Sequence, residues 1–167
     1  MNYAHLHMVV NHFPIIGTIF GLGILIAGLF LKNNTVKNTA YILFSVAAIF
    51  AFASMYTGEG AEEIVEDFPN IGKQIIHEHE ELAEKFAIVM YVLGFASLIG
   101  LYLNLKNNAN AKLMSFVVLT ISLVGVVLAK AVGTSGGEIR HTEIRENSLE
   151  TAVNKIENKE LEAKDAD

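Results

Sequence analysis

Four long apolar runs constrain this chain more than any other feature. They lie at about 12–31, 39–56, 86–105 and 113–132, and each is long enough to cross a hydrocarbon core of about 30 Å as a helix. A soluble bundle would show polar residues recurring on one face of each helix. In "IIGTIFGLGILIAGLFL" and "LMSFVVLTISLVGVVLA" the only residues that are not large and apolar or alanine are Gly, Thr and Ser. The pattern predicts an all-α fold, a four-transmembrane-helix bundle in the lipid bilayer.

The domain boundary is expected near residue 147, between the four-helix transmembrane domain at 1–147 and a polar, partly helical or disordered tail at 148–167. A weak repeat runs through the first part, because "LKNN" occurs at 31–34 and again at 105–108, with His5 and His79 equally far upstream. The repeat suggests a duplicated helical hairpin, whose two halves would surround an axis along the membrane normal.

The charges in the loops predict the orientation. The connections "KNNTVKN" and "KNNANAK" carry lysine and no acid, while the middle connection is rich in Glu. By the positive-inside rule the lysine loops face the cytoplasm, although Arg140 and Arg145 after the fourth span count against this choice. We expect an integral protein of a prokaryotic cytoplasmic (inner) membrane, with no removed signal peptide and with both termini extracytoplasmic.

Composition excludes several functional classes. The chain has no cysteine, so disulfides, thiolate nucleophiles and Cys-ligated metal centres are ruled out. A net charge of -6 argues against nucleic-acid binding. A transporter is unattractive because the spans carry no ionisable residue at mid-membrane, Lys130 lying near one end. No motif names a substrate, so whether the protein is an enzyme stays open.

All six histidines are predicted to lie at the extracytoplasmic end of the bundle. His5, His7 and His12 lie at the outer end of the first span, His77 and His79 lead into the third, and His141 follows the fourth. At about 1.5 Å of rise per residue they can share one layer. On a helix His5 and His12 point one way while His7 and Asn11 point another, so only one of these two sets can face the bundle axis.

His7, His12, His79 and His141 are the better candidate ligands, since they come from three different helices, and we expect His5 and His77 to be solvated. Possible further ligands or orienting partners near them are Glu62, Glu80, Arg140 and Glu143.

Glycines accompany this layer. We expect a glycine-punctuated exit from the second span followed by a short amphipathic helix at 60–67, and a sharp backbone path or flexible linker at Gly133, Gly136 and Gly137. Gly17 and Gly21 in the first span either allow close helix packing, the favoured interpretation, or leave room for a flat cofactor.

Four motifs, "LHMVVNHFPIIGT", "TGEGAEEIVEDFP", "HEHEELA" and "GGEIRHTEI", resemble a family of four-span membrane proteins classed as domain of unknown function 2231. The likeness covers roughly 5–145. Relatives are sometimes joined to cytochrome c or Rieske-type domains, so the resemblance implies redox work at the membrane without naming a reaction. By motif position it points to His7, Asn11, His12, Glu62, His79, Glu80, Arg140 and His141.

Three functions compete. The favoured hypothesis is a haem b protein for electron transfer, with two axial histidines, His12 with His79 or His141, and with Arg140 on a propionate. The second is a non-haem iron, copper or zinc site, with ligands drawn from His7, His12, His79, His141, Glu62 and Glu80. The third is a cofactor-free structural or assembly subunit. Quinone or a respiratory redox protein is a conceivable partner, and a homo-oligomer is possible.

Overall fold

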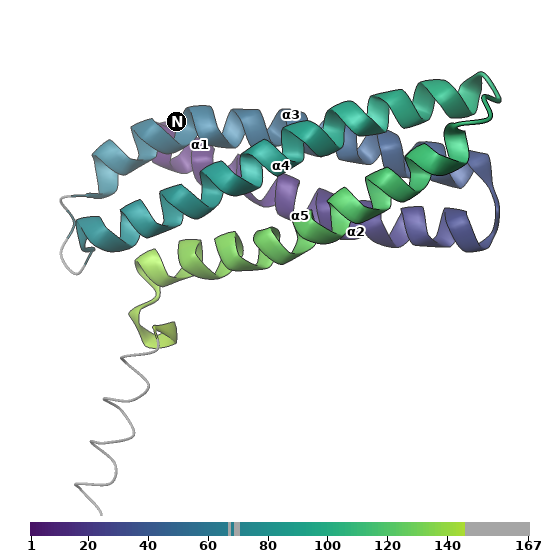
Figure 1. The fold of residues 1–167 in the computed structure, drawn as a ribbon. Helices are drawn as coiled ribbons and strands as arrows, with labels where there is room; N and C mark the ends of the chain where they lie inside the picture. The colour runs from purple at the N-terminus through teal and green to yellow at the C-terminus, as the bar shows by residue number, and fades with distance from the viewer. Residues whose placement is uncertain (67, 69–70, 146–167) are drawn as a thin grey trace, which may run out of the picture.

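The computed structural model describes residues 1–66, 68 and 71–145, and these residues form an antiparallel helical bundle (Figure 1). Its elements are α1 (Tyr3–Val10), α2 (His12–Phe30), α3 (Asn34–Val65), α4 (Lys73–Leu105), α5 (Ala111–Arg140) and a short 3₁₀ turn, η1 (Thr142–Ile144). No strand occurs in this described part of the chain, so the predicted all-α bundle is confirmed. The predicted tail at 148–167 lies outside the described residues.

Four helical stretches of the described chain are long and apolar enough to cross a membrane: Tyr3–Phe30, Asn34–Val65, Lys73–Leu105 and Ala111–Arg140. The helices α3, α4 and α5 have 32, 33 and 30 residues, which corresponds to about 45–50 Å of helix. A hydrocarbon core takes up only about 30 Å of that length. The helices therefore project beyond their apolar runs, and Glu59, Lys85 and Lys130 are exposed near the start of the projecting parts.

The helices do not end at their glycines, and two sequence-based expectations are wrong here. Helix α3 continues through Gly58 and Gly60 to Val65 without the predicted exit and separate helix at 60–67. Helix α5 continues through the predicted bend at Gly133, Gly136 and Gly137 to Arg140. No glycine in the described residues has a positive φ. These glycines serve close contacts instead: a Cβ at Gly60 would come within 2.7 Å of the Tyr3 ring.

A helix break at Asn11 separates α1 from α2. Pro14 explains it, because proline lacks the N–H that would bond to the Val10 carbonyl, and its ring clashes with that carbonyl. The break changes the direction of the chain, so that α1 packs on α3, whereas α2 packs on both α3 and α5. In Figure 1 α1 lies beside the carboxyl-terminal part of α3.

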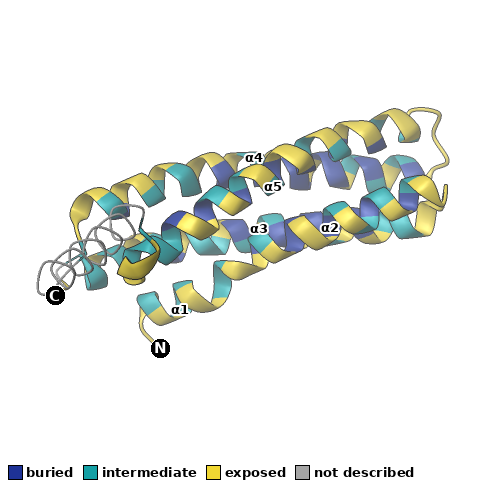
Figure 2. Ribbon diagram, turned by 90° about the horizontal axis from the view of Figure 1, so that it is seen from below, coloured by how far each residue is buried: buried dark blue, intermediate teal, exposed yellow. Residues whose placement is uncertain are grey.

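Inward faces of the long helices form one core, centred on Leu25, Tyr41, Phe44, Met90 and Val118, each 0% exposed. Figure 2 shows the buried residues on the faces turned toward neighbouring helices and the exposed ones on the outer faces. Large apolar side chains such as Phe20, Phe52 and Phe95 lie outward, as lipid contact requires.

Gly17 and Gly21 of α2 lie against α3. A Cβ at Gly17 would lie 2.8 Å from the Ala47 Cβ, and one at Gly21 would lie 2.5 Å from the Phe44 ring. The packing interpretation of these glycines is confirmed, and the alternative that they leave room for a flat cofactor is wrong, because α3 already fills the space.

Candidate functional site

Two histidines turn inward at the end of the bundle where α1, α3, α4 and α5 meet. His7 of α1 and His79 of α4 are half-buried, and both lie in helix ends that project beyond the apolar runs. Of the two faces of the amino-terminal segment, it is therefore the one carrying His7 and Asn11 that turns toward the bundle, while His5 and His12 are exposed.

His7 is held by the last turns of α3. Its Nδ1 lies 3.1 Å from the Ser54 carbonyl oxygen and 3.2 Å from Thr57 Oγ1. The imidazole also lies over Gly58, where a Cβ would be 3.5 Å from the His7 Cε1. The Ser54 carbonyl can only accept a hydrogen bond, and the Thr57 hydroxyl already donates to a carbonyl of its own helix, at 2.9 Å from the Ala53 oxygen. The proton of neutral His7 must therefore be on Nδ1.

His79 is held by α5 in the same manner. Its Nδ1 lies 2.8 Å from Ser135 Oγ, and that hydroxyl donates to the Val132 carbonyl oxygen at 3.2 Å. The ring lies on Gly136, where a Cβ would be 3.0 Å from the His79 Cε1. In the tautomer in which Ser135 donates to Val132, His79 donates to Ser135 through Nδ1. Both imidazoles thus leave Nε2 with its lone pair available, the form in which histidine binds a metal.

The two halves of the chain build this arrangement with the same parts. In each half a histidine bonds to a hydroxyl on the next long helix and lies on the glycine that follows the hydroxyl. The pairs Thr57–Gly58 and Ser135–Gly136 occupy equivalent places. The predicted duplicated hairpin has a structural counterpart here, with His7 rather than His5 as the equivalent of His79.

Burial disfavours the charged form of both imidazoles. Desolvation lowers the pKa of His7 from its usual 6.5, with His12 adding a smaller effect in the same direction and the Ser54 carbonyl opposing it. Desolvation also lowers the pKa of His79, and the nearby charge on protonated His7 lowers it further. The effect of His7 on His79 indicates that a charge on the His7 ring would be felt at His79.

Three atoms near the pair remain without a hydrogen bond to a described residue. They are the two Nε2 atoms and Oδ1 of Asn11, which is buried. Asn11 lies one turn from His7 on the same face, so its oxygen is directed to the same side of the segment. The site therefore offers two nitrogen lone pairs and one unpaired amide oxygen.

The other predicted ligands lie elsewhere. His12 is exposed and its Nδ1 lies 3.2 Å from the Met8 carbonyl oxygen in its own turn. His141 is exposed and lies 2.8 Å from Glu143 Oε1. The Arg140 guanidinium stands 5.6 Å from the centre of the Phe68 ring. The described residues contain no group of three or more His, Asp or Glu arranged to hold a metal ion.

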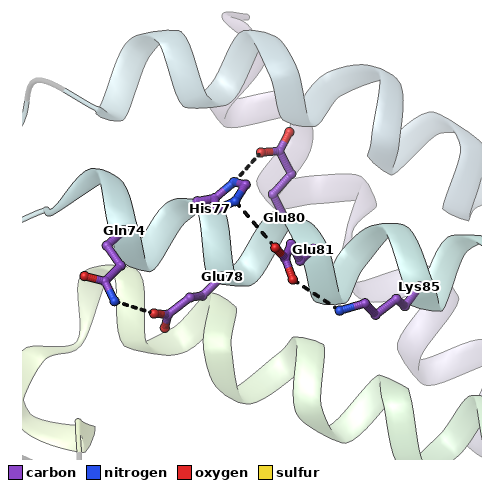
Figure 3. A network of polar contacts seen from close by, with 6 residues as sticks. All are labelled: Gln74, His77, Glu78, Glu80, Glu81 and Lys85. Carbon is purple, nitrogen blue, oxygen red and sulfur yellow. Dashed lines mark hydrogen bonds and ion pairs between the residues drawn. The ribbon is translucent and has the colours of Figure 1, made fainter.

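The acidic candidates Glu62 of α3 and Glu80 of α4 are half-buried. Glu80 lies 3.8 Å from the Nδ1 of His77, and Glu81 lies 3.5 Å from its Nε2 (Figure 3). Burial, together with the negative charges of Glu80 and Glu66, raises the pKa of Glu62. Exposed pairs of this kind on one helix contribute a few tenths of a kcal/mol. The ion pairs of His77 with Glu80 and Glu81 therefore add little to stability.

Sequence reasoning missed the residues that orient the histidines, Ser54, Thr57 and Ser135. A signal was present, because a hydroxyl residue precedes glycine in both "TGEGA" and "SGGEI". We interpreted these glycines as breaks, so the hydroxyls beside them were not assigned to a helix face.

The family profile described as "Predicted membrane protein (DUF2231)" matches residues 4–143. The chain belongs to this family. The match includes the whole DUF2231 membrane bundle with both histidine–hydroxyl pairs. No curated protein and no solved structure matches the chain.

Proposed function

We propose that this DUF2231 protein binds haem b between its two halves for electron transfer, with His7 and His79 as the axial ligands. The observation that carries the proposal is the pair of neutral imidazoles, one from each half, each with Nδ1 engaged and Nε2 available. A structural zinc site takes four protein ligands, whereas haem iron takes four nitrogens from its own macrocycle and needs only two. Two neutral histidines with available Nε2 atoms suit haem best.

The two histidines suit haem iron because they are neutral and because hydrogen bonds at Nδ1 orient their rings. Neutral imidazole is the usual axial ligand of b-type haem, and a hydrogen bond from Nδ1–H fixes the ring and strengthens Nε2 as a donor. Ser54 and Thr57 do this for His7, and Ser135 does it for His79. When bound, haem supplies a one-electron redox centre. The protein's own contribution is to hold the two ligands, keep them neutral and limit water.

Asn11 favours a second candidate, a non-haem iron, copper or zinc site. Its buried Oδ1 has no hydrogen bond to a described residue, and an amide oxygen beside two imidazoles makes a mixed nitrogen and oxygen donor set. Haem gives this oxygen no partner, whereas a metal ion or a metal-bound water does. A cofactor-free subunit, in which the histidines only fasten α1 and α4 to their neighbours, is the third possibility.

Haem titration of the detergent-purified protein, with metal analysis on the same sample, separates the three. The haem proposal expects one haem per chain and a sharp absorption band on reduction. Stoichiometric iron, copper or zinc without haem would establish the second candidate, with Asn11→Leu reducing metal content. Absence of both would leave the cofactor-free subunit.

The partners and the orientation are part of the proposal. A redox site at the membrane surface can exchange electrons with a quinone or with a respiratory redox protein. We place the protein in a prokaryotic inner membrane with both termini extracytoplasmic, because the connections after α2 and α4 carry the lysines.

The cysteine-free chain makes the orientation testable by single-cysteine labelling. Glu63→Cys and Ala109→Cys place a thiol at exposed positions at opposite ends of the bundle. A membrane-impermeant maleimide added to cells stripped of their outer layers should label Glu63→Cys and spare Ala109→Cys. The reverse labelling pattern would invert the orientation.

A further inference from the structure

A second polar region lies at the opposite end of the bundle from the histidines, and its hydrogen bonds are incomplete. Ser97, Gly100 and Asn104 are spaced three and four residues apart, so they share one face of α4. The ring of Tyr41 from α3 lies on Gly100, where a Cβ would be 3.0 Å from the Tyr41 Cζ. The Tyr41 hydroxyl lies 2.8 Å from Ser115 Oγ of α5. Three helices thus bring polar groups together inside the membrane part of the bundle.

Two buried oxygens in this region have no partner among the described residues. Ser97 is 0% exposed and Asn104 is 4% exposed, yet Ser97 Oγ and Asn104 Oδ1 make no hydrogen bond. The amide of Asn104 is otherwise engaged, since its Nδ2 donates to Asn38 Oδ1 at 3.0 Å.

Other buried serines show that the missing bond at Ser97 is specific to its position. Ser115 and Ser122 on α5 are equally buried, and each donates to a carbonyl oxygen of its own helix, at 2.9 Å and 2.8 Å. A helix satisfies a buried hydroxyl readily in this way. The Ser97 hydroxyl is not bonded to its own helix, so its partner is to be sought in the space beside the helix.

We propose that these oxygens bind ordered water, and that the part of the bundle nearest the lysine-bearing loops is hydrated from Asn104 to Ser97. Water satisfies both orphaned oxygens and can donate to each of them. Asn38 is half-buried and its neighbours Thr35 and Thr39 are exposed, so the region begins close to the loop surface. From Asn104 to Ser97 the path extends about 10 Å along α4.

Apolar side chains close the path beyond Ser97. Leu93 and Met90, the next inward residues of α4, are both 0% exposed. The nearby Thr18 hydroxyl is satisfied within the protein, since it donates to the Pro14 carbonyl oxygen at 2.6 Å and lies 3.0 Å from the Met90 sulfur. The proposed hydrated region therefore ends at Ser97, and it is independent of the cofactor proposal.

The sign of a stability change tests the proposal first. With water bound at Ser97, Ser97→Ala removes a partner of that water, and the melting temperature in detergent should fall by about 2–4 °C. In a dry interior the same change removes an unsatisfied buried hydroxyl and should raise the melting temperature. Ser122→Ala is the matched control, because its hydroxyl is satisfied by its own helix.

Radiolytic hydroxyl-radical footprinting provides the second test, since it produces radicals from bound water in place. Tyr41 and Phe44 are both 0% exposed on α3, and each labelling rate is normalised to that of the unfolded chain. Hydration predicts strong labelling of Tyr41 relative to Phe44, reduced in the Asn104→Leu variant. Protection of Tyr41 equal to that of Phe44, or a rise in the melting temperature of Ser97→Ala, overturns the proposal.

Discussion

His79 Nδ1 and Ser135 Oγ lie 2.8 Å apart across the contact between α4 and α5, and the first half of the chain repeats the arrangement with His7 and Thr57 at 3.2 Å. In both halves the hydroxyl belongs to the next membrane-spanning stretch along the chain, α3 for His7 and α5 for His79. The orientation of the two imidazoles is thus set by partners on the neighbouring helices, and removing a partner should disturb a cofactor site without removing its ligand.

Ser135→Ala is the corresponding variant. It leaves His79 in place but takes away the acceptor that holds its proton on Nδ1, so haem affinity should fall about 10- to 100-fold. A haem titration of the variant measures the loss. Ser122→Ala removes a serine hydroxyl from the same helix away from the site, and its haem affinity should equal that of the wild type. An unchanged affinity in Ser135→Ala would show that this hydrogen bond does not prepare the ligand.

The close packing of α2 on α3 predicts that the two α2 glycines Gly21 and Gly23 differ in their tolerance of alanine. A Cβ at Gly21 would lie 2.5 Å from the Phe44 ring, which is 0% exposed, whereas a Cβ at Gly23 would meet nothing within 4 Å. Gly21→Ala should therefore destabilise the bundle by about 1–3 kcal/mol. Gly23→Ala should not lower stability, because alanine favours the helix. Thermal unfolding in detergent compares the two, and equal effects would contradict the packing described.

How far the sequence predicts this structure depends on the range of the interactions concerned. The apolar runs require only local length and composition, so the four helices were predictable. Gly58, Gly60 and Gly136 looked like helix breaks because the residues that contact them are distant in the sequence. His7 covers Gly58, Tyr3 covers Gly60 and His79 covers Gly136. Local propensity cannot reveal which glycine another helix will approach.

The candidate site shows the same limit. Helical spacing separated His7 and Asn11 from His5 and His12, but it could not say which face turns inward. Pro14 decides this, since the break at Asn11 directs α1 onto α3 and brings His7 to Thr57. The favoured axial histidine, His12, is exposed in the structure. Glu62 and Glu80 were included for their chemistry, and Glu80 pairs with the exposed His77.

Stability should depend on pH through the buried histidines. The pKa values of His7 and His79 are lowered on folding from about 6.5, so below that pH the unfolded chain binds more protons than the folded one. Stability is then full above pH 6.5 and is lost as the pH falls toward the folded values. Positive charge on His12 lowers the pKa of His7, and positive charge on His7 lowers the pKa of His79.

Melting temperatures between pH 7.5 and 5 measure this effect. His79→Asn retains a donor toward Ser135 but no longer titrates, so its melting temperature should decline less with falling pH than that of the wild type. His5→Asn alters an exposed histidine and should follow the wild-type profile. If the melting temperatures of all three proteins fall equally with pH, His79 does not contribute to the pH dependence of stability.

The turn between α2 and α3 holds strain that glycine would relieve. Lys32 is exposed and has a φ of 51°, a region that costs a side-chain-bearing residue about 1–2 kcal/mol. Lys32→Gly should stabilise the protein by about 0.5–1 kcal/mol once the greater freedom of glycine in the unfolded chain is subtracted. Asn107 has a φ of 49°, and asparagine tolerates this region better, so Asn107→Gly should gain less. Thermal unfolding compares the two, and a loss of stability in Lys32→Gly would contradict the interpretation.

The central claim, that His7 and His79 together hold haem, is tested most directly by reduced-minus-oxidised absorption spectra of four haem-reconstituted proteins: wild type, His7→Ala, His79→Ala and His12→Ala. We expect the two-histidine spectrum in the wild type and in His12→Ala, and its loss in His7→Ala and in His79→Ala, with all four proteins inserted in the membrane. A wild-type spectrum in His7→Ala, or loss of the spectrum only in His12→Ala, would show that His7 and His79 do not hold haem together.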